Sequence, residues 1–575
     1  MLGRIAAGVV WNAVIATTLC AQVGPEVLKQ LPDSALAVIL VNRLGATSKK
    51  IESIGQRLHL PVPGLLPIAK LRLGLNEGVD DEGSAAMAFL PRNDGDAGAA
   101  DFLIAIPVTD YAKFLGQLAP ENADASPTAV MIAGQPAHVA RKGSFALLAK
   151  DNAVLKSALE AKRSVADVAG ALAAWQTEND IVAISTPAGI GYSLDAIQNG
   201  LAGAQAGVAN LDAATRSVVE MYYDLFEAVS GQARSDLQLL AVGLRVTGDT
   251  DLISSMRAIF TPDSGWDKSA KQATGVDTDL FLGLPPGPFV LALGMGKVGD
   301  WVGRLTDLSA EMIRSSTEQS GKPMTEAQVK QLRELYRPMV QQVRGMSMSV
   351  ALPRPDAGVF SGTVGVVHVD SAKEYLAVVE RYSADYQKLA EEINSPMLPP
   401  YSLKKTKIAG NDGLEVAVDL SAFAQKQPNP EVFKHFDKLF GPGGKMTAYY
   451  SVALDDHTVL FGYDRATIEQ LVAHPPKPSL TDDQLVGESM QLLPSGSQFM
   501  SLFDLGNSMR LAAQVVQLMK DDPTFTLPEF PAAPPIGVAA RLSADGFELR
   551  KAVPNKTLDA FGKFIDAARQ QQLNR

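Results

Sequence analysis

The feature that most constrains the fold is a set of segments that occurs twice, in the same order, along the 575-residue chain. The paired segments are 36–41 with 288–293, 106–115 with 367–376, 132–141 with 408–418, and 144–159 with 457–472. Each pairing is weak when taken alone, but their shared order is not expected by chance. Because self-similarity indicates a repeated architecture, we interpret the chain as two duplicated halves.

A finer pattern lies within each half, which holds two copies of strand, helix, strand, strand and helix. The four copies begin at Leu36, Asp180, Phe289 and Gln498. Turn-rich loops at 92–98 and 353–358 separate the last two strands of a copy, and short loops of this kind join antiparallel neighbours. The sequence therefore predicts an α+β fold with largely antiparallel sheets and helices packed on one face.

The helix that closes each copy carries two further signals. Polar residues that could cap its first turn stand before three of these helices, namely Thr109, Asp370 and Asn555. Aromatic residues follow five or six positions later, namely Phe114, Tyr375 and Phe561. We expect these rings to reach back onto the sheet.

The length suggests roughly two to four domains, because single cores seldom grow beyond about 250–300 residues. The predicted organisation is a signal peptide (1–21), a first half (22–268), a polar linker (269–280) and a second half (281–575). Between its two copies, each half also holds an extra hairpin and helix, at 128–162 and 402–474. The second of these inserts is the longer one.

The first 21 residues have the layout of a secretory signal peptide. Arg4 provides a positive start, and an apolar run from Ile5 to Leu19 follows. About fifteen apolar residues are too few for a typical membrane span. We therefore expect export to the periplasm or beyond and no transmembrane span after cleavage. Lipid anchoring at Cys20 is not expected, because it would need a small residue where Leu19 stands; a buried N-terminal helix is the alternative.

Charge argues against a nucleic-acid partner. Lys and Arg number 52 against 63 Asp and Glu, which gives a net charge of -11. Phosphate neutralisation by a basic face supplies most of the affinity of nucleic-acid binders. The densest basic spot, Lys404, Lys405 and Lys407, is interpreted as the solvated face of an edge strand.

Motifs that could carry chemistry have simpler structural explanations. Gly294, Gly296 and Gly299 imitate a dinucleotide fingerprint, but the next strand arrives only near Met346, far beyond a normal βαβ unit. A Ser-x-x-Lys motif begins at Ser402, in a predicted strand where positions three apart point to opposite faces. None of the 6 histidines has a metal-site spacing. The sequence thus predicts no catalytic, cofactor-binding or metal-binding residues.

Three segments of the first half carry a family resemblance. They are 31–58 (LPDSALAVILVNRLGATSKKIESIGQRL), 76–91 (NEGVDDEGSAAMAFLP) and 132–149 (IAGQPAHVARKGSFALLA). They resemble a group of uncharacterised exported bacterial proteins, and the resemblance weakens in the second half. It implies export and a shared fold, and no ligand or active residue.

Extra helices are predicted within the second and third copies, at 211–229 and 325–343. Thr325 and Gln328 form a capping box at the start of the latter. If both helices stand away from the sheets, they form an apolar groove for a lipid, a peptide or a second subunit. Its candidate lining residues are Val218, Leu225, Leu332 and Met339. The alternative is that both helices cover their own sheets.

These observations favour a non-catalytic binding or scaffolding protein of the bacterial cell envelope. The alternative hypothesis is a hydrolase-type enzyme with a site in the cleft between the two halves. A deep pocket with converging carboxylates or histidines would favour the enzyme, whereas a flat sheet or apolar groove would favour binding.

Overall fold

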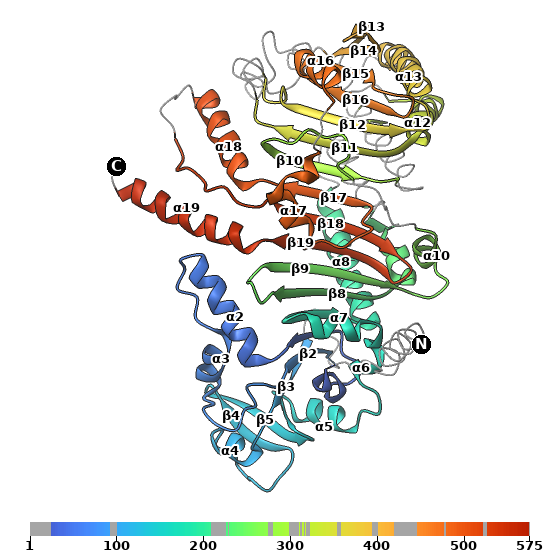
Figure 1. Ribbon diagram of the computed structural model, residues 1–575. Helices are drawn as coiled ribbons and strands as arrows, with labels where there is room; N and C mark the ends of the chain where they lie inside the picture. Colours follow the sequence, from blue (N-terminus) through green and yellow to red (C-terminus); the bar gives the residue numbers. More distant parts are fainter. Residues whose placement is uncertain are drawn as a thin grey trace, which may run out of the picture. The chain divides into compact units, whose positions relative to one another are not determined.

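The computed structural model describes most of the chain (Figure 1). The described residues are 25–92, 100–208, 223, 226–227, 229–273, 280–297, 310, 313–314, 317, 323–353, 358–393, 401–418, 446–475, 479–520 and 526–573. The predicted signal peptide therefore lies outside them. The chain divides into two compact units: residues 1–198 with 232–269 form the first, and residues 199–231 with 270–575 form the second.

The first unit follows the predicted element order. Its elements are η1 (Glu26–Gln30), β1 (Ala37–Val41), α2 (Leu44–Arg57), α3 (Leu65–Leu73), β2 (Ala85–Pro91), β3 (Ala100–Pro107), α4 (Tyr111–Gly116), β4 (Thr128–Ile132), β5 (Gln135–Lys142), β6 (Phe145–Ala149), α5 (Asn152–Glu160), α6 (Val165–Val168), η2 (Gly170–Leu172), α7 (Ala173–Glu178), β7 (Ile181–Ser185), α8 (Pro187–Val208), β8 (Leu237–Val246), β9 (Leu252–Phe260) and α10 (Gly265–Gln272). The boundary between units falls within α8, and the predicted linker begins inside α10.

The strands of the first unit form one antiparallel sheet in the order β4-β5-β6-β3-β2-β1-β7-β8-β9. At its centre, the first strands of the two copies pair with each other: Val41 of β1 lies opposite Ile181 of β7. The α+β class and the antiparallel pairing are as predicted.

Helices cover the two faces of this sheet differently. On one face Val38, Leu103 and Leu147 pack in a core that includes Leu155 of α5 and Trp175 of α7, all of them buried. The opposite face is covered at its β3–β6 end by α4, whose Phe114 and Leu115 contact Ile106 and Leu148. Farther along the sheet, this second face has no comparable cluster of buried residues among those described.

The second unit repeats the order with one additional strand. Its elements are β10 (Phe289–Met295), α12 (Glu326–Gln341), β11 (Val343–Ala351), β12 (Thr363–Val369), α13 (Ala372–Ile393), β13 (Tyr401–Ile408), β14 (Asn411–Val418), β15 (Met446–Ala453), β16 (Thr458–Gly462), α16 (Arg465–Ala473), η5 (Leu480–Asp482), α17 (Gln484–Met490), β17 (Phe499–Phe503), α18 (Leu505–Lys520), β18 (Ile536–Ser543), β19 (Gly546–Val553) and α19 (Asn555–Leu573). Its sheet runs β13-β14-β15-β16-β12-β11-β10-β17-β18-β19, again antiparallel.

The register defines equivalent positions in the two units. Met295 pairs with Phe499 as Val41 pairs with Ile181. Beyond these pairs, the N–H of Asn42 donates to the carbonyl of Asp180, and the N–H of Gly296 donates to that of Gln498, both at 2.8 Å. β15 is the additional strand, and it follows the longer insert of the second half.

The closing helices match the prediction in position but not in every cap. The N-cap of α4 is Asp110 rather than Thr109, because the Asp110 carboxylate accepts the N–H groups of Ala112 and Lys113. In α13 the hydroxyl of Ser371 accepts the N–H of Glu374. Asp370 instead pairs with Arg344. In α19, Asn555 is already the first helical residue.

The predicted rings and strand residues lie as follows. Phe114 and Tyr375 are buried against their sheets, as predicted, and Phe561 is only half-buried. Ser402 and the lysines near 405 lie on β13, which pairs with β14 alone in the described part of the second unit. Lys405 and Lys407 bind Glu380 and Asp412, so the interpretation as a solvated edge strand is confirmed.

Candidate functional site

A pocket of ≈ 450 Å³ opens on the first unit, between η1, β5 and the segment joining α5 to α6. Asp167 is the acidic residue in its wall, and the basic ones are Lys29, Lys142, Lys162 and Arg163. Such a set of charges could attract an anion. Whether these side chains are available to an anion depends on the contacts that they already make.

Three of the four cations bind groups of their own unit. The Lys142 ammonium donates to the carbonyls of Gln30 at 3.4 Å and Ala158 at 2.9 Å, and burial lowers its pKa. Lys29 pairs with Glu26 at 2.7 Å, and Arg163 with Asp33 at 3.6 Å. These contacts join η1, β5 and α5, so we assign the pocket cations a structural role.

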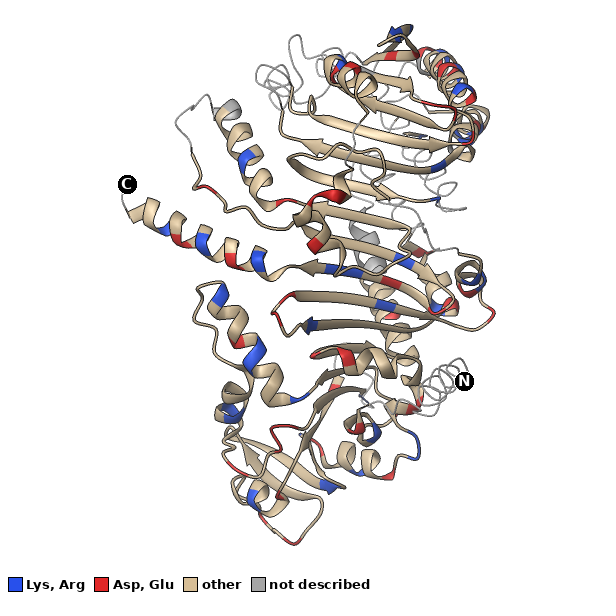
Figure 2. Ribbon diagram, viewed as in Figure 1, with Lys and Arg blue, Asp and Glu red and all other residues tan. Residues whose placement is uncertain are grey.

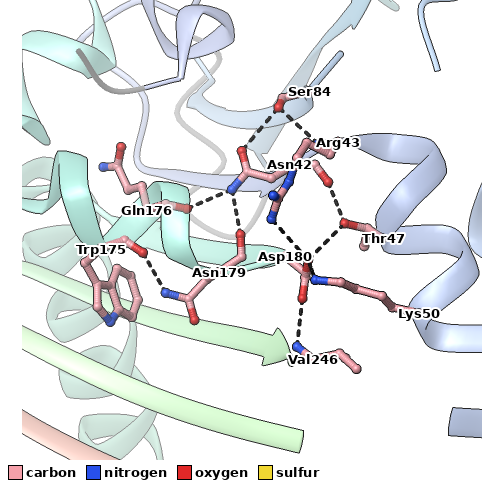
Figure 3. Close-up of polar contacts among 10 residues, drawn as sticks. All are labelled: Asn42, Arg43, Thr47, Lys50, Ser84, Trp175, Gln176, Asn179, Asp180 and Val246. Carbon is pink, nitrogen blue, oxygen red and sulfur yellow. Dashed lines mark hydrogen bonds and ion pairs between the residues drawn. The ribbon is translucent and has the colours of Figure 1, made fainter. Parts of the chain in front are cut away.

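A buried polar network lies where β1 ends and β7 begins (Figure 3). The Asp180 carboxylate, 3% exposed, accepts the Val246 N–H at 2.7 Å. The ammonium of Lys50 lies 2.7 Å from Asp180 Oδ1, and the guanidinium of Arg43 lies 3.6 Å away. The Thr47 hydroxyl donates to the same oxygen at 3.5 Å. Figure 3 shows these three side chains pointing toward Asp180, two of them from α2 and Arg43 from the position just before it.

Asn42 completes the network from the end of β1. Its Nδ2 donates to the carbonyls of Gln176 at 2.7 Å and Asn179 at 2.8 Å, and its Oδ1 accepts the Ser84 hydroxyl at 3.2 Å. A buried carboxylate is tolerated only when charges and hydrogen bonds compensate its lost hydration. The network therefore fixes the base of α2 to the sheet.

This network is not among the residues predicted from the sequence, although the sequence contains a signal for it. Asn42 and Arg43 directly follow one predicted strand, and Asp180 is the first residue of another. Antiparallel pairing of the first strands of the two copies brings those two strand ends together. Opposite charges at these two strand ends would have indicated a contact. The prediction lacked only the pairing of β1 with β7, the first strands of the two copies.

The second face of the first unit carries a row of apolar side chains, which we call the open face. Directly opposed residues carry the row across five strands from β9 to β2, and two residues farther along β2 a second opposed pair extends it onto β3. Its members are Phe102 (β3), Phe89 and Met87 (β2), Ile39 (β1), Ala183 (β7), Val242 (β8) and Met256 (β9). Six strands at a spacing of about 4.8 Å make the row about 24 Å long.

The residues of the open face are accessible. Phe102 is 51% exposed and Val242 is 46% exposed, while Phe89, Met87 and Ile39 are half-buried. The rings of Phe89 and Phe102 contact edge to face, with centroids 5.4 Å apart. Scattered exposed apolar residues are ordinary, so the alignment of these residues in one row, rather than their exposure alone, makes the open face a candidate binding surface.

Equivalent positions of the second unit are more polar. Thr363, Ser501 and Lys551 occupy the positions of Phe102, Ala183 and Met256, as the strand registers define them. The two sheets share one backbone plan, so this difference comes from side chains alone. The other four positions stay apolar in the second unit, as Val350, Met348, Leu293 and Val538, so the two rows differ at three of seven positions, two of which are the ends of the row.

Two of the four predicted groove residues fall within the described part of the chain. Leu332 of α12 is 1% exposed and packs against Leu389 and Ile393 of α13. Met339 is half-buried beside the core that contains Tyr375. The predicted capping box is present, because the Thr325 N–H donates to Gln328 Oε1 at 2.9 Å.

The described part of α12 therefore covers α13 at Leu332. Val218 and Leu225 lie outside the described side chains, so the groove as a whole stays a prediction. The glycines near 294 have a packing explanation in the described residues. A Cβ on Gly294 would lie 2.6 Å from the Leu280 carbonyl oxygen, so glycine lets two backbone segments approach closely.

The described residues contain no group of three or more His, Cys, Asp or Glu side chains that could hold a metal ion. Among the described helices, none is sufficiently long and apolar to cross a membrane. Comparison with protein-family models, curated proteins and solved structures finds no match. The resemblance to exported bacterial proteins thus stays a prediction.

Proposed function

We propose that the chain is an exported, non-catalytic binding protein whose open face holds the hydrocarbon chain of a lipid. The observation that carries this proposal is the apolar row from Phe102 to Met256, which crosses six strands of the first unit. The predicted signal peptide supports the location. Both the location and the ligand are inferences to be tested.

The chemistry of the row favours hydrocarbon over peptide. Its side chains are aliphatic, aromatic or thioether groups, which offer no strong hydrogen-bonding partner. A peptide lying there would have to leave backbone groups on its inner side unsatisfied, at a cost of a few kcal/mol each. An acyl chain has no such groups and gains about 0.8 kcal/mol for each CH₂ that it buries.

A fluorescent fatty acid bearing an anthroyloxy group would test the proposal. We expect saturable fluorescence enhancement with the wild-type chain. The double substitution Phe102→Thr and Met256→Lys, which installs the residue types of Thr363 and Lys551 in the second unit, should weaken binding about tenfold. This follows because losing partial burial of a large apolar side chain costs about 1 kcal/mol or more.

Phe503→Thr is the matched control, because Phe503 is 38% exposed on β17 of the second unit. It should bind the probe as the wild type does. An absence of saturable binding by the wild type would overturn the proposal. Equal weakening by the double variant and by Phe503→Thr would remove the assignment to the open face.

A further inference from the structure

Helix α3 is apolar on all sides and yet has no buried residue. Its sequence is LLPIAKLRL, in which Lys70 and Arg72 are the only polar residues. Leu71 is 84% exposed and Leu65 is 41% exposed. A helix that is apolar all round normally lies in a protein core or in a membrane. Because α3 does not lie in the core, its surroundings require another explanation.

The exposed apolar groups of α3 extend into the connection from α2. We call residues 44–73 the α2–α3 hairpin. Val62, in the turn between its helices, is 39% exposed. Val62, Leu65 and Leu71 therefore place three accessible apolar side chains close together in the sequence of the hairpin, within ten residues.

The α2–α3 hairpin is also basic. It has one acidic residue, Glu52, and five basic residues, in a chain with a net charge of -11, and two of the five are paired with carboxylates outside the hairpin. The basic residues are Lys49, Lys50, Arg57, Lys70 and Arg72. Figure 2 shows Lys and Arg along both helices. Accessible leucines beside basic groups are complementary to a surface that has an anionic outer layer and an apolar interior.

Ion pairs hold the base of the α2–α3 hairpin in place. Lys50 binds Asp180 at 2.7 Å, and Lys70 binds Asp81 at 2.6 Å. Between the helices, the N–H of Leu66 donates to the Ser48 hydroxyl at 3.1 Å. The hairpin is thus presented in a fixed conformation, which lowers the ordering cost of docking.

We propose that the α2–α3 hairpin docks on the surface of a bilayer that contains anionic phospholipid. Leu65 and Leu71 insert among the acyl chains, and Lys49 and Arg72 lie at the phosphates. Side chains of this kind bury an aliphatic stem and keep the charged end at the headgroups. The inference does not depend on a ligand at the open face.

Vesicle co-sedimentation tests the docking. The chain from residue 22 onward contains every described residue and lacks the predicted signal peptide, whose apolar run would itself bind lipid. We expect it to sediment with vesicles of phosphatidylcholine and phosphatidylglycerol, and much less with phosphatidylcholine alone. Lys49→Gln with Arg72→Gln should weaken the partitioning roughly 25-fold, because each charge contributes about fivefold.

Two leucines of similar exposure distinguish specific docking from nonspecific adsorption to vesicles. Leu71 is 84% exposed on α3, and Leu573 is 86% exposed at the end of α19. Leu71→Ser should weaken sedimentation about tenfold, whereas Leu573→Ser should leave it unchanged. Equal behaviour of the two variants would overturn the proposal, as would equal binding to the two vesicle types or binding to neither. Phe102→Thr with Met256→Lys should leave vesicle binding intact, so docking and ligand binding can fail separately.

Discussion

At equivalent positions, the two units use different side chains to bind the backbone at the end of a neighbouring strand. In the second unit, Gln498 precedes β17, accepts the N–H of Leu542 at 2.8 Å and donates to the Leu542 carbonyl at 2.9 Å. In the first unit, Asp180 precedes β7 and accepts the N–H of Val246 at 2.7 Å. A neutral amide is therefore sufficient to close this strand end.

The charge of Asp180 must serve another purpose. Its additional partners, Arg43, Thr47 and Lys50, lie in the first half of α2 or directly before it. At the positions of Asn42 and Arg43, the second unit has Gly296 and Lys297. We therefore expect the carboxylate to hold the α2–α3 hairpin, because a neutral amide already satisfies the strand end in the second unit.

The largest expected effect comes from Asp180→Ala. It leaves Lys50 without its countercharge and the Val246 N–H without its acceptor, and should destabilise the first unit by about 3 kcal/mol. Asp180→Gln, which installs the residue of the second unit, should cost less because an amide oxygen can still accept that N–H. Hydrogen exchange in increasing urea measures both variants.

The two substitutions should also differ in which elements they loosen. Asp180→Gln should speed exchange across α2 more than across β8, because the charge holds the helix and the hydrogen bond holds the strand. Gln498→Ala should affect β18 by about 1–2 kcal/mol and leave α2 unchanged. Uniform exchange of α2 and β8 in Asp180→Gln would show that the carboxylate has no special role in holding the helix.

A second comparison concerns volume in the sheet. Ile104 of β3 lies opposite Leu148 of β6, and the equivalent pair in the second unit is Gly365 and Phe461. A Cβ on Gly365 would overlap the ring of Phe461. In the first unit two aliphatic side chains fill the space between these strands. In the second unit the ring of Phe461 fills it alone, because Gly365 has no side chain.

Gly365→Ile should therefore destabilise the second unit by about 2 kcal/mol through overpacking. Adding Phe461→Leu recreates the pair of the first unit and should restore much of the loss. A double-mutant cycle, followed by urea-dependent exchange of β12, measures the coupling. Simple additivity of the two substitutions would mean that these positions are not interchangeable between the units.

Much of the fold followed from the sequence because strand and helix periodicities and their order are local signals. All four predicted copies have the expected sequence of elements, and the loops at 92–98 and 353–358 join antiparallel neighbours. Cap positions were less predictable: Thr109 and Asp110 are adjacent polar residues, and only the backbone geometry selects Asp110.

The candidate site was less accessible from the sequence, because it depends on how strands are ordered. The open face combines residues from β3 to β9 that become neighbours only through sheet pairing. The burial of Leu332 depends on α13, which lies more than forty residues farther along the chain. Periodicity identifies an apolar side of a helix or strand, but it does not identify what covers that side.

The smallest expected effect concerns pH. His368 of β12 occupies the position of Pro107 in the first unit, which cannot titrate. Burial lowers the pKa of His368, and this outweighs the opposing effects of a backbone hydrogen bond with Leu282 and of the Asp455 charge. The unfolded chain therefore binds a proton at this position more readily than the folded chain does.

Stability linked to His368 is thus fully present above the ordinary histidine pKa of about 6.5 and falls as the pH drops through that value. His368→Gln should remove this part of the slope between pH 7.5 and 5.5, as measured by exchange of β12 at each pH. Exchange of β3 in the first unit serves as the internal control, because Pro107 contributes no such term. A slope for β12 that is the same in the wild type and in His368→Gln would assign the pH dependence to other groups.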